Sequence, residues 1–435
     1  MDRNIFKGNS KILLNIILLI LFDCNPSFQR SNWQYFSVLK LFSISGKQGL
    51  TDIGNTPTPA PTPISLSYNG SPYTFLMGTT ISQVTPTISN PISNCISSPS
   101  LPAGLNLNNT TCAISGTPTI WQQSTNYTIT ANNSTGSTTA NISISVTSDA
   151  SMWTGRTLPS SSNWYSVAYG NGVFVAIAGG VGPSTIAATS IDGINWVAQT
   201  LPSSSTWASV TFGNGLFVAV AKGPSTAAAY SADGISWTAS TLPSSQSWFS
   251  VTFGNGRFVT VGNSSTAAAY SNDGINWNAS SPLPSGSQWT AVVYGNGIYA
   301  TVASGPSTAA ASSPDGITWT ARTLPTSSGW YSMAFGNGIF VANASGPSNA
   351  SAYSTDGMNW TGSTLPSSSS WAASAFGNGV FFVVATSSNT AATSLDGITW
   401  TPRTMPTVTN WYSVAYGQGK FVAIALTSNV AASSP

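Results

Sequence analysis

A heptad of the form Ser-x-Asp-Gly-x-x-Trp recurs in this chain and constrains its fold more than any other feature. The heptads end at Trp196, Trp237, Trp277, Trp319, Trp360 and Trp400. Successive ends lie 40 to 42 residues apart, a period typical of propeller blades or repeat arrays. The sequence therefore predicts a repeat protein.

Each repeat carries signals for four short strands. In the third repeat a strand starts at Trp248, Asn255-Gly256 marks a tight hairpin, and Asp273-Gly274 marks a second turn. Asn and Gly tolerate the positive φ angles of a type I′ turn, and glycine after aspartate suits a left-handed turn position. Four short strands in about forty residues make one propeller blade.

The number of first strands predicts the number of blades. These strands begin at Trp164, Trp207, Trp248, Trp289, Trp330, Trp371 and Trp411. Six complete Asp-Gly turns lie between them, and Asp149-Ala150-Ser151-Met152-Trp153 is a degenerate seventh copy. We therefore expect an all-β, seven-bladed propeller over residues 149–435, whose last blade takes its outer strand from residues 149–157. Such closure removes the free edges of an open array.

The N-terminal residues have the features of an export signal. Basic residues precede an apolar run from Ile12 to Phe22, which is too short to span a bilayer as a helix. Leu21-Phe22-Asp23-Cys24 resembles a bacterial lipobox, so we expect residues 1–23 to be a lipoprotein signal peptide and Cys24 to carry the lipid. A plain signal peptide and a transmembrane anchor stay open as alternatives. Residues 24–63 end in a Pro/Thr-rich run and are expected to form an extended tether.

Residues 64–147 contain short alternating runs such as Ile142-Ser143-Ile144-Ser145-Val146. This pattern predicts an N-terminal β-sandwich of immunoglobulin size. Leu101-Pro102-Ala103-Gly104-Leu105, followed by Ile114-Ser115-Gly116-Thr117-Pro118, resembles the immunoglobulin-like, cadherin-related modules of bacterial surface proteins. The resemblance implies a spacer or adhesion module without catalytic residues.

Cys95 and Cys112 are the only cysteines besides Cys24. In an exported protein we expect them to form a disulfide, which would add about 3 kcal/mol by the chain-entropy estimate. Two buried free thiols are the alternative.

The propeller repeats resemble the Asp-box (BNR) family, found in sialidases and in many non-enzymatic propellers. In this chain Asp and Gly are adjacent, whereas the family motif has one residue between them. The family's box is a structural turn remote from any active site. The resemblance therefore implies a structural role for Asp149, Asp192, Asp233, Asp273, Asp315, Asp356 and Asp396.

The composition argues against catalysis. The chain has no His and no Glu, and seven of its ten Asp are the box aspartates. Glycoside hydrolysis needs paired carboxylates, and common triads and metal sites need His or clustered Cys and carboxylates. We expect no enzyme activity, cofactor or metal, with a sialidase-like glycosidase as the disfavoured alternative. Arg156, Arg322 and Arg403 follow box tryptophans by three residues and are expected on outer strands.

The seven first-strand tryptophans are the candidate ligand-binding residues. Aromatic faces near a propeller axis suit stacking on sugars or anchoring of a protein. Small residues follow them, as Ser166 and Ala168 follow Trp164, and this pattern favours core packing. Ligand contact stays open as the second interpretation.

The charge pattern limits the partners. Only 5% of the residues are charged and no basic patch is present, so we expect no nucleic-acid partner. The sequence favours a monomeric adhesion protein, lipid-anchored at the bacterial cell envelope, at the outer membrane or cell surface, that binds a glycan or an extracellular protein. A scaffold for envelope assembly is the remaining alternative.

Overall fold

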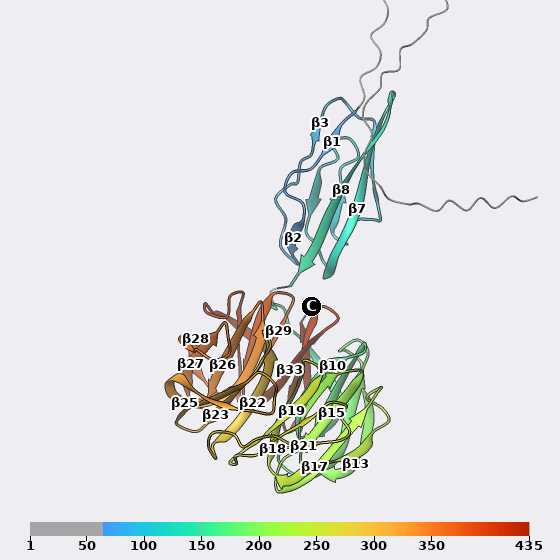
Figure 1. Ribbon diagram of the computed structural model, residues 1–435. Coiled ribbons are helices and arrows are strands. Elements are labelled where there is room, and N and C mark those ends of the chain that lie inside the picture. Colours follow the sequence, from blue (N-terminus) through green and yellow to red (C-terminus); the bar gives the residue numbers. More distant parts are fainter. Residues whose placement is uncertain (1–63, 149, 435) are drawn as a thin grey trace, which may run out of the picture. The chain divides into compact units, whose positions relative to one another are not determined.

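The computed structural model describes residues 64–148 and 150–434, in which every regular element is a β-strand (Figure 1). The predicted signal peptide, Cys24, the tether and Asp149 lie outside the described residues. The strands of the first part are β1 (Leu66–Ser67), β2 (Tyr73–Leu76), β3 (Thr87–Ile88), β4 (Asn94–Ser98), β5 (Leu105–Leu107), β6 (Ile114–Gly116), β7 (Gln122–Asn133) and β8 (Gly136–Thr147). They form one four-stranded sheet, β2-β8-β7-β4, and the pairs β1-β3 and β5-β6.

The long hairpin of β7 and β8 supplies the core of this first part. Side chains on a strand alternate between its two faces, so Ile129 and Ile144 point inward and are fully buried. Cys95 on β4 and Cys112 just before β6 form the predicted disulfide, with an S–S distance of 2.06 Å. The bond therefore connects the four-stranded sheet to the β5-β6 pair.

The second part is built of four-stranded units in which each strand pairs with the next along the chain. The first unit is β10 (Trp164–Gly170), β11 (Val173–Ala178), β12 (Ser184–Ser190) and β13 (Val197–Ser205). The strands that follow are β14 (Trp207–Gly213), β15 (Leu216–Ala221), β16 (Ser225–Ser231), β17 (Thr238–Gln246), β18 (Trp248–Gly254), β19 (Arg257–Gly262), β20 (Ala268–Ser271), β21 (Asn278–Ala279), β22 (Gln288–Gly295), β23 (Ile298–Ser304), β24 (Ser307–Ser313), β25 (Thr320–Gly336), β26 (Ile339–Ser345), β27 (Ser348–Ser354), β28 (Thr361–Ser369), β29 (Trp371–Gly377), β30 (Val380–Ala385), β31 (Ser388–Ser394), β32 (Thr401–Thr409), β33 (Trp411–Gly417), β34 (Lys420–Ala425) and β35 (Ser428–Ser434). Figure 1 shows these sheets arranged around a common centre.

One sheet has seven strands, β22 to β28, because β25 belongs to two units. The first half of β25 pairs with β24, where Ser328 lies opposite Ser307. The second half of β25 pairs with β26, where Trp330 lies opposite Ala344. It is therefore the outer strand of one unit and the first strand of the next.

The first and last units close the ring. β9 (Thr154–Ser162) pairs with β35, with Thr154 opposite Ser433. The outer strand of the last unit therefore precedes the first unit in the chain, as predicted, but it spans residues 154–162 and not 149–157. Neighbouring first strands are also joined by serine. The Ser413 hydroxyl accepts a hydrogen bond from the Val167 amide at 3.1 Å. This bond joins the last unit to the first.

The two glycines of each Gly-Asn-Gly motif are required for different structural reasons. A Cβ on Gly170 would lie 1.9 Å from the Phe212 ring of the next unit, so the first glycine permits close approach of an aromatic ring. The second glycine forms the turn, in which Asn171 has a φ of 48° and Gly172 a φ of 81°. These positive angles are those expected of the predicted hairpin.

The Asp-Gly turns connect the third and fourth strands of the first six units and are held by their own side chains. In the second unit the Asp233 carboxylate accepts hydrogen bonds from the amides of Ile235 and Ser236, both at 2.8 Å. The Ser231 hydroxyl accepts one from the Gly234 amide at 2.9 Å. The bonds from Ser236 and Ile235 lower the pKa of Asp233. These aspartates are thus structural acceptors.

Candidate ligand-binding site at the channel mouth

The seven first-strand tryptophans are core residues, so the interpretation that they contact a ligand is wrong. Each is 0% exposed. Each indole N–H donates to the carbonyl four residues earlier, as Trp164 does to Ser160 at 3.0 Å. The indoles fill the space between neighbouring units, as the pattern of small residues suggested, and a ligand at the surface does not touch them.

The residue after each tryptophan faces the axis instead. On β10, Trp164 pairs with Ala178 and Ser166 with Ile177, so Tyr165 is an extra, bulged residue. The same shift recurs on the other first strands. A β-bulge redirects the side chain that it carries. Here it directs the side chain toward the axial channel.

These axis-facing residues surround one end of the channel, which we name the channel mouth. They are Tyr165, Ala208, Phe249, Thr290, Tyr331, Ala372 and Tyr412, and all of them line an axial cavity of about 410 Å³. Large and small side chains alternate around the ring. With an odd number of positions the alternation cannot close, so two tyrosines, from the last and first units, are neighbours.

The four aromatic rings meet across the axis. The ring centroids of Tyr165 and Tyr412 lie 4.4 Å apart, those of Phe249 and Tyr331 6.0 Å, and those of Tyr165 and Phe249 6.3 Å. Edge-to-face and tilted contacts of this kind are favourable beyond the area that they bury. Phe249, Tyr331 and Tyr412 are half-buried, so part of each ring is accessible.

A hydrogen-bond network and one cation complete the cluster. The Tyr412 hydroxyl donates to that of Tyr165 at 2.7 Å and is also bonded to the Tyr331 hydroxyl. Lys222, directly after β15, donates from Nζ to the Tyr165 hydroxyl at 3.1 Å. Its ammonium lies 4.7 Å from the Tyr165 centroid and 5.4 Å from that of Phe249, within cation–π distance.

Burial determines the protonation of this cluster. It raises the pKa of Tyr165, Tyr331 and Tyr412 above the ordinary value of 10.0 and lowers that of Lys222 from 10.5. The phenols are therefore neutral near pH 7 and act as hydrogen-bonding groups. The mouth offers aromatic faces, hydroxyls and one ammonium to a ligand.

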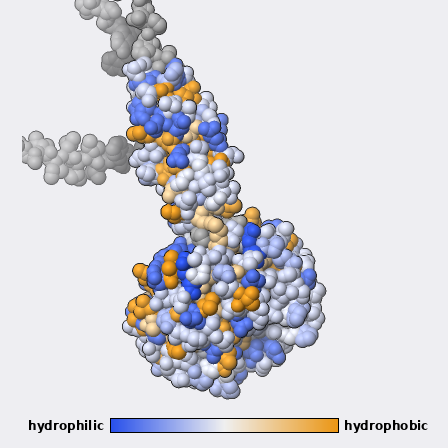
Figure 2. Space-filling model, turned by 180° about the vertical axis from the view of Figure 1, so that it is seen from behind, coloured by the Kyte–Doolittle hydropathy of each residue, from blue (hydrophilic) through white to orange (hydrophobic). Residues whose placement is uncertain are grey.

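The other sequence-predicted residues lie elsewhere. Arg156 on β9 and Arg322 on β25 are on outer strands, where their Nε atoms donate to Ser433 at 2.9 Å and Ser312 at 2.8 Å. Arg403 is on the outer strand β32. No group of three or more His, Cys, Asp or Glu that could hold a metal lies within residues 64–148 and 150–434. On the face that Figure 2 shows, hydrophobic side chains form small separate groups.

The sequence prediction named the first strands, and the side chains that line the axial cavity lie one position after the predicted tryptophans. Strict alternation would already place the residue after a buried tryptophan on the opposite face. The signal was present in the sequence as Tyr165, Phe249, Tyr331 and Tyr412, aromatic residues that directly follow alternate first-strand tryptophans. The bulge that directs them to the axis has no comparable signal.

Comparison with known families supports an immunoglobulin-like domain in the first part of the chain. Residues 56–147 match the family described as "Putative Ig domain". A search of curated proteins gives no match. In the part of the chain that the structure describes, no helix has the length and apolar character needed to cross a membrane.

Similarity to solved structures supports a propeller-like fold for the second part of the chain. Virginiamycin B lyase from Staphylococcus aureus superposes with a TM-score of 0.57 at 12% identity, covering 65% of this chain and 98% of that chain. YCF48 from Cyanidioschyzon merolae gives 0.52 at 15%, covering 65% and 98%. YCF48 bound to D1 peptide gives 0.52 at 18%, covering 65% and 94%. At these identities the similarity shows the fold alone, a propeller-like all-β structure.

Proposed function

We propose that this chain is an exported, lipid-anchored adhesion protein of the bacterial cell surface, whose seven-bladed Asp-box propeller binds a protein partner without catalysis. The half-buried aromatic cluster at the channel mouth, with Lys222 above it, carries the proposal. Export and lipidation at Cys24 rest on the sequence of the N-terminal residues.

A protein partner fits this cluster better than a glycan does. The hydroxyls of Tyr165, Tyr331 and Tyr412 already bond to one another and to Lys222, so much of their hydrogen-bonding capacity is used. Aromatic faces beside a cation are typical anchors of protein interfaces. The propeller-like YCF48 has been solved with a D1 peptide, so a peptide ligand is compatible with this fold.

The residue types at the mouth oppose a catalytic role. Burial raises the pKa of the three tyrosines further above 10.0, which disfavours a phenolate base. One solved virginiamycin B lyase is a catalytically inactive variant in which a histidine is replaced by alanine. This chain has no His and cannot reproduce that group. A sialidase-like activity would also lack its Glu.

The proposal is tested by panning the full chain after the signal peptide against a random-peptide display library and an extracellular-matrix protein panel, with a glycan array in parallel. Variants Tyr331→Leu and Lys222→Met remove a ring and a charge while retaining apolar volume. Val408→Ser, at a position 71% exposed on β32, is the matched surface control.

We expect wild type and Val408→Ser to bind the same peptides or protein, and Tyr331→Leu to bind at least about tenfold more weakly, the scale of a central aromatic anchor. Binding that both mouth variants leave unchanged would overturn the proposal. A glycan lost from the same variants would replace the protein ligand by a sugar. Absence of any ligand, with a copurifying envelope protein that mouth variants retain, would favour the assembly scaffold.

A further inference from the structure

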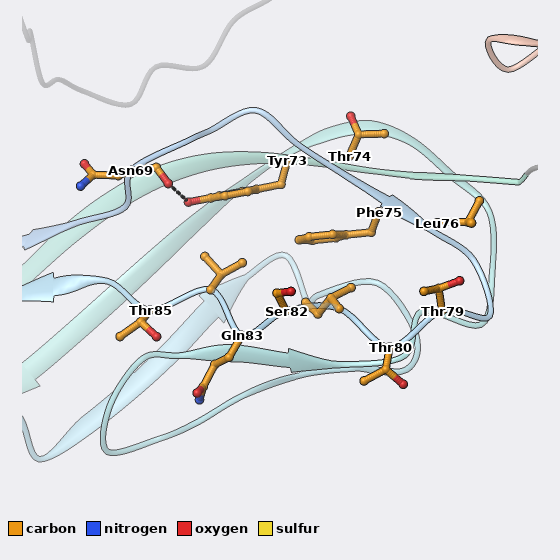
Figure 3. Close-up of a pocket in the computed structure, with 12 residues that line it drawn as sticks. Asn69, Tyr73, Thr74, Phe75, Leu76, Thr79, Thr80, Ser82, Gln83 and Thr85 are labelled. Carbon is orange, nitrogen blue, oxygen red and sulfur yellow. Dashed lines mark hydrogen bonds between the residues drawn. The ribbon is translucent and has the colours of Figure 1, made fainter. Parts of the chain in front are cut away.

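The immunoglobulin-like part contains a second cleft, distinct from the channel mouth. It lies between the edge strand β2 and residues 79–85, has a volume of about 480 Å³, and is shown in Figure 3. Residues 78–84 leave β2 and cross to the other layer. There the amides of Ile81 and Val84 donate to Gly116 at 2.9 Å and Ile114 at 2.9 Å. The cleft is therefore held open by the backbone on both sides.

Two parallel aromatic rings form one wall of this cleft. Tyr73 and Phe75 are two residues apart on β2 and so share a face. Their centroids lie 5.9 Å apart with an interplanar angle of 8°. Figure 3 shows the two rings edge-on, side by side between β2 and the segment that carries Ser82 and Gln83. The Tyr73 hydroxyl donates to the Asn69 carbonyl at 2.6 Å, which fixes the orientation of that ring.

Uncharged polar side chains contribute to the rest of the lining, and Figure 3 shows Ser82 on the side of the rings and Gln83 on the far side of its segment. The cleft is lined by Thr74, Thr79, Thr80, Ser82, Gln83 and Thr85, all of which are exposed. Thr80 bonds to Thr117 at 2.8 Å, which holds that hydroxyl in place. Thr74 lies between Tyr73 and Phe75 on β2, points to the opposite side of the strand (Figure 3) and bonds to Ser145 at 3.1 Å. Hydroxyl and amide groups both donate and accept hydrogen bonds, which matches the alternating demands of sugar hydroxyls.

The absence of charge in this part limits the ligand further. Residues 64–148 contain no Asp, Glu, Lys, Arg or His. A charged ligand would lose its hydration in the cleft and find no opposite charge, which is unfavourable. An apolar ligand would leave the polar rim unused. A ring with C–H groups on its faces and hydroxyls at its edge uses both features.

We propose that this cleft binds a neutral pyranose unit of a glycan, stacked on Tyr73 and Phe75 and hydrogen-bonded by the side chains of residues 79–85. The site is independent of the propeller mouth. It gives the immunoglobulin-like part a ligand of its own, in addition to any spacing role.

The test is isothermal titration of the full chain after the signal peptide with maltohexaose, cellohexaose and chitohexaose, and with polygalacturonate as the charged probe. Phe75→Leu removes one ring and keeps apolar volume, and Ser82→Ala removes a hydroxyl on the side of the rings. Tyr73→Phe keeps the ring and loses only the hydroxyl. Tyr331→Leu alters the propeller mouth alone, and thermal unfolding verifies that each variant is folded.

We expect at least one neutral hexasaccharide to bind, and raising the salt from about 0.05 to 0.5 M to leave its affinity unchanged, since charge screening has nothing to act on. Phe75→Leu should weaken binding at least about tenfold, the loss of roughly one stacking contact. Ser82→Ala should weaken it less, and so should Tyr73→Phe, which loses the hydroxyl that orients the ring. Tyr331→Leu should bind the sugar as wild type. No binding of any neutral hexasaccharide, or binding that a folded Phe75→Leu retains, would overturn the proposal. Sugar binding lost only from Tyr331→Leu would place the sugar site on the propeller.

Discussion

A buried polar pair in the fifth unit should limit the stability of the propeller. Asn343 on β26 lies opposite Ser351 on β27. In the other units the same opposed pair is Ile177 and Ala187, Val220 and Ala228, Val261 and Ala268, Val302 and Ala310, Val384 and Ala391, or Ile424 and Ala431. The pair is therefore apolar everywhere in the ring except here.

The cost of this exception can be estimated from its hydrogen bonds. Asn343 is 0% exposed, and its Oδ1 accepts from the Ser351 hydroxyl at 3.0 Å. Its Nδ2 has no partner among the described residues. A buried donor without a partner costs about 1–3 kcal/mol. The double substitution Asn343→Val and Ser351→Ala removes it and should raise the free energy of unfolding by about 2 kcal/mol.

Calorimetry and urea unfolding measure the effect, which corresponds to a rise in Tm of roughly 4 °C for a domain of this size. Ser351→Ala alone leaves both ends of the amide unpaired and should destabilise by about 1 kcal/mol. The converse change in the preceding unit, Val302→Asn with Ala310→Ser, is the matched control and should lower Tm. An unchanged or lower Tm in the Asn343→Val, Ser351→Ala variant would refute the reasoning.

Three further predictions concern the turns, the ring contacts and the closure. The pKa of Asp233 is lower in the folded chain than its ordinary 3.8, so its stabilising effect is complete above that value and is lost as pH falls below it. Tm measured by circular dichroism between about pH 5 and pH 2 should fall less steeply in Asp233→Asn than in wild type, and equal slopes would contradict this. Gly254→Ala places a Cβ 2.0 Å from the Tyr294 ring and should cost about 3 kcal/mol in urea unfolding. Gly256→Ala, where φ is 73° and nothing lies within 4 Å, should cost only about 1–2 kcal/mol, and the reverse order would be inconsistent with the ring contact. Deleting residues 149–157 removes four of the five residue pairs between β9 and β35 and should destabilise by about 5 kcal/mol or more. An unchanged Tm after the deletion would exclude the closure.

Features encoded by neighbouring residues could be predicted from the sequence. Asn171-Gly172 must turn because both residues tolerate positive φ, and the structure gives 48° and 81°. The degenerate box before Trp153 indicated which segment completes the last unit, and β9 pairs there. In each case a few adjacent residues carry the information.

Features that depend on another unit were missed. No role for the first glycine of each Gly-Asn-Gly motif was predicted from the sequence, but Gly170 is needed because Phe212 of the next unit lies against it. The axis-facing role of Tyr165 depends on a bulge in the pairing of β10 with β11. The Tyr73 and Phe75 cleft was missed because it depends on where residues 79–85 cross to the other layer.

The position of β9 also has a mechanical consequence. The described chain passes from β8 at Thr147 to β9 within a few residues, and β9 is held to the last strand, β35. If the N-terminal side is anchored and a partner is held by the propeller, tension along the chain enters the propeller at the β9–β35 pairing. The strength of that single antiparallel seam would then set the force at which the ring opens.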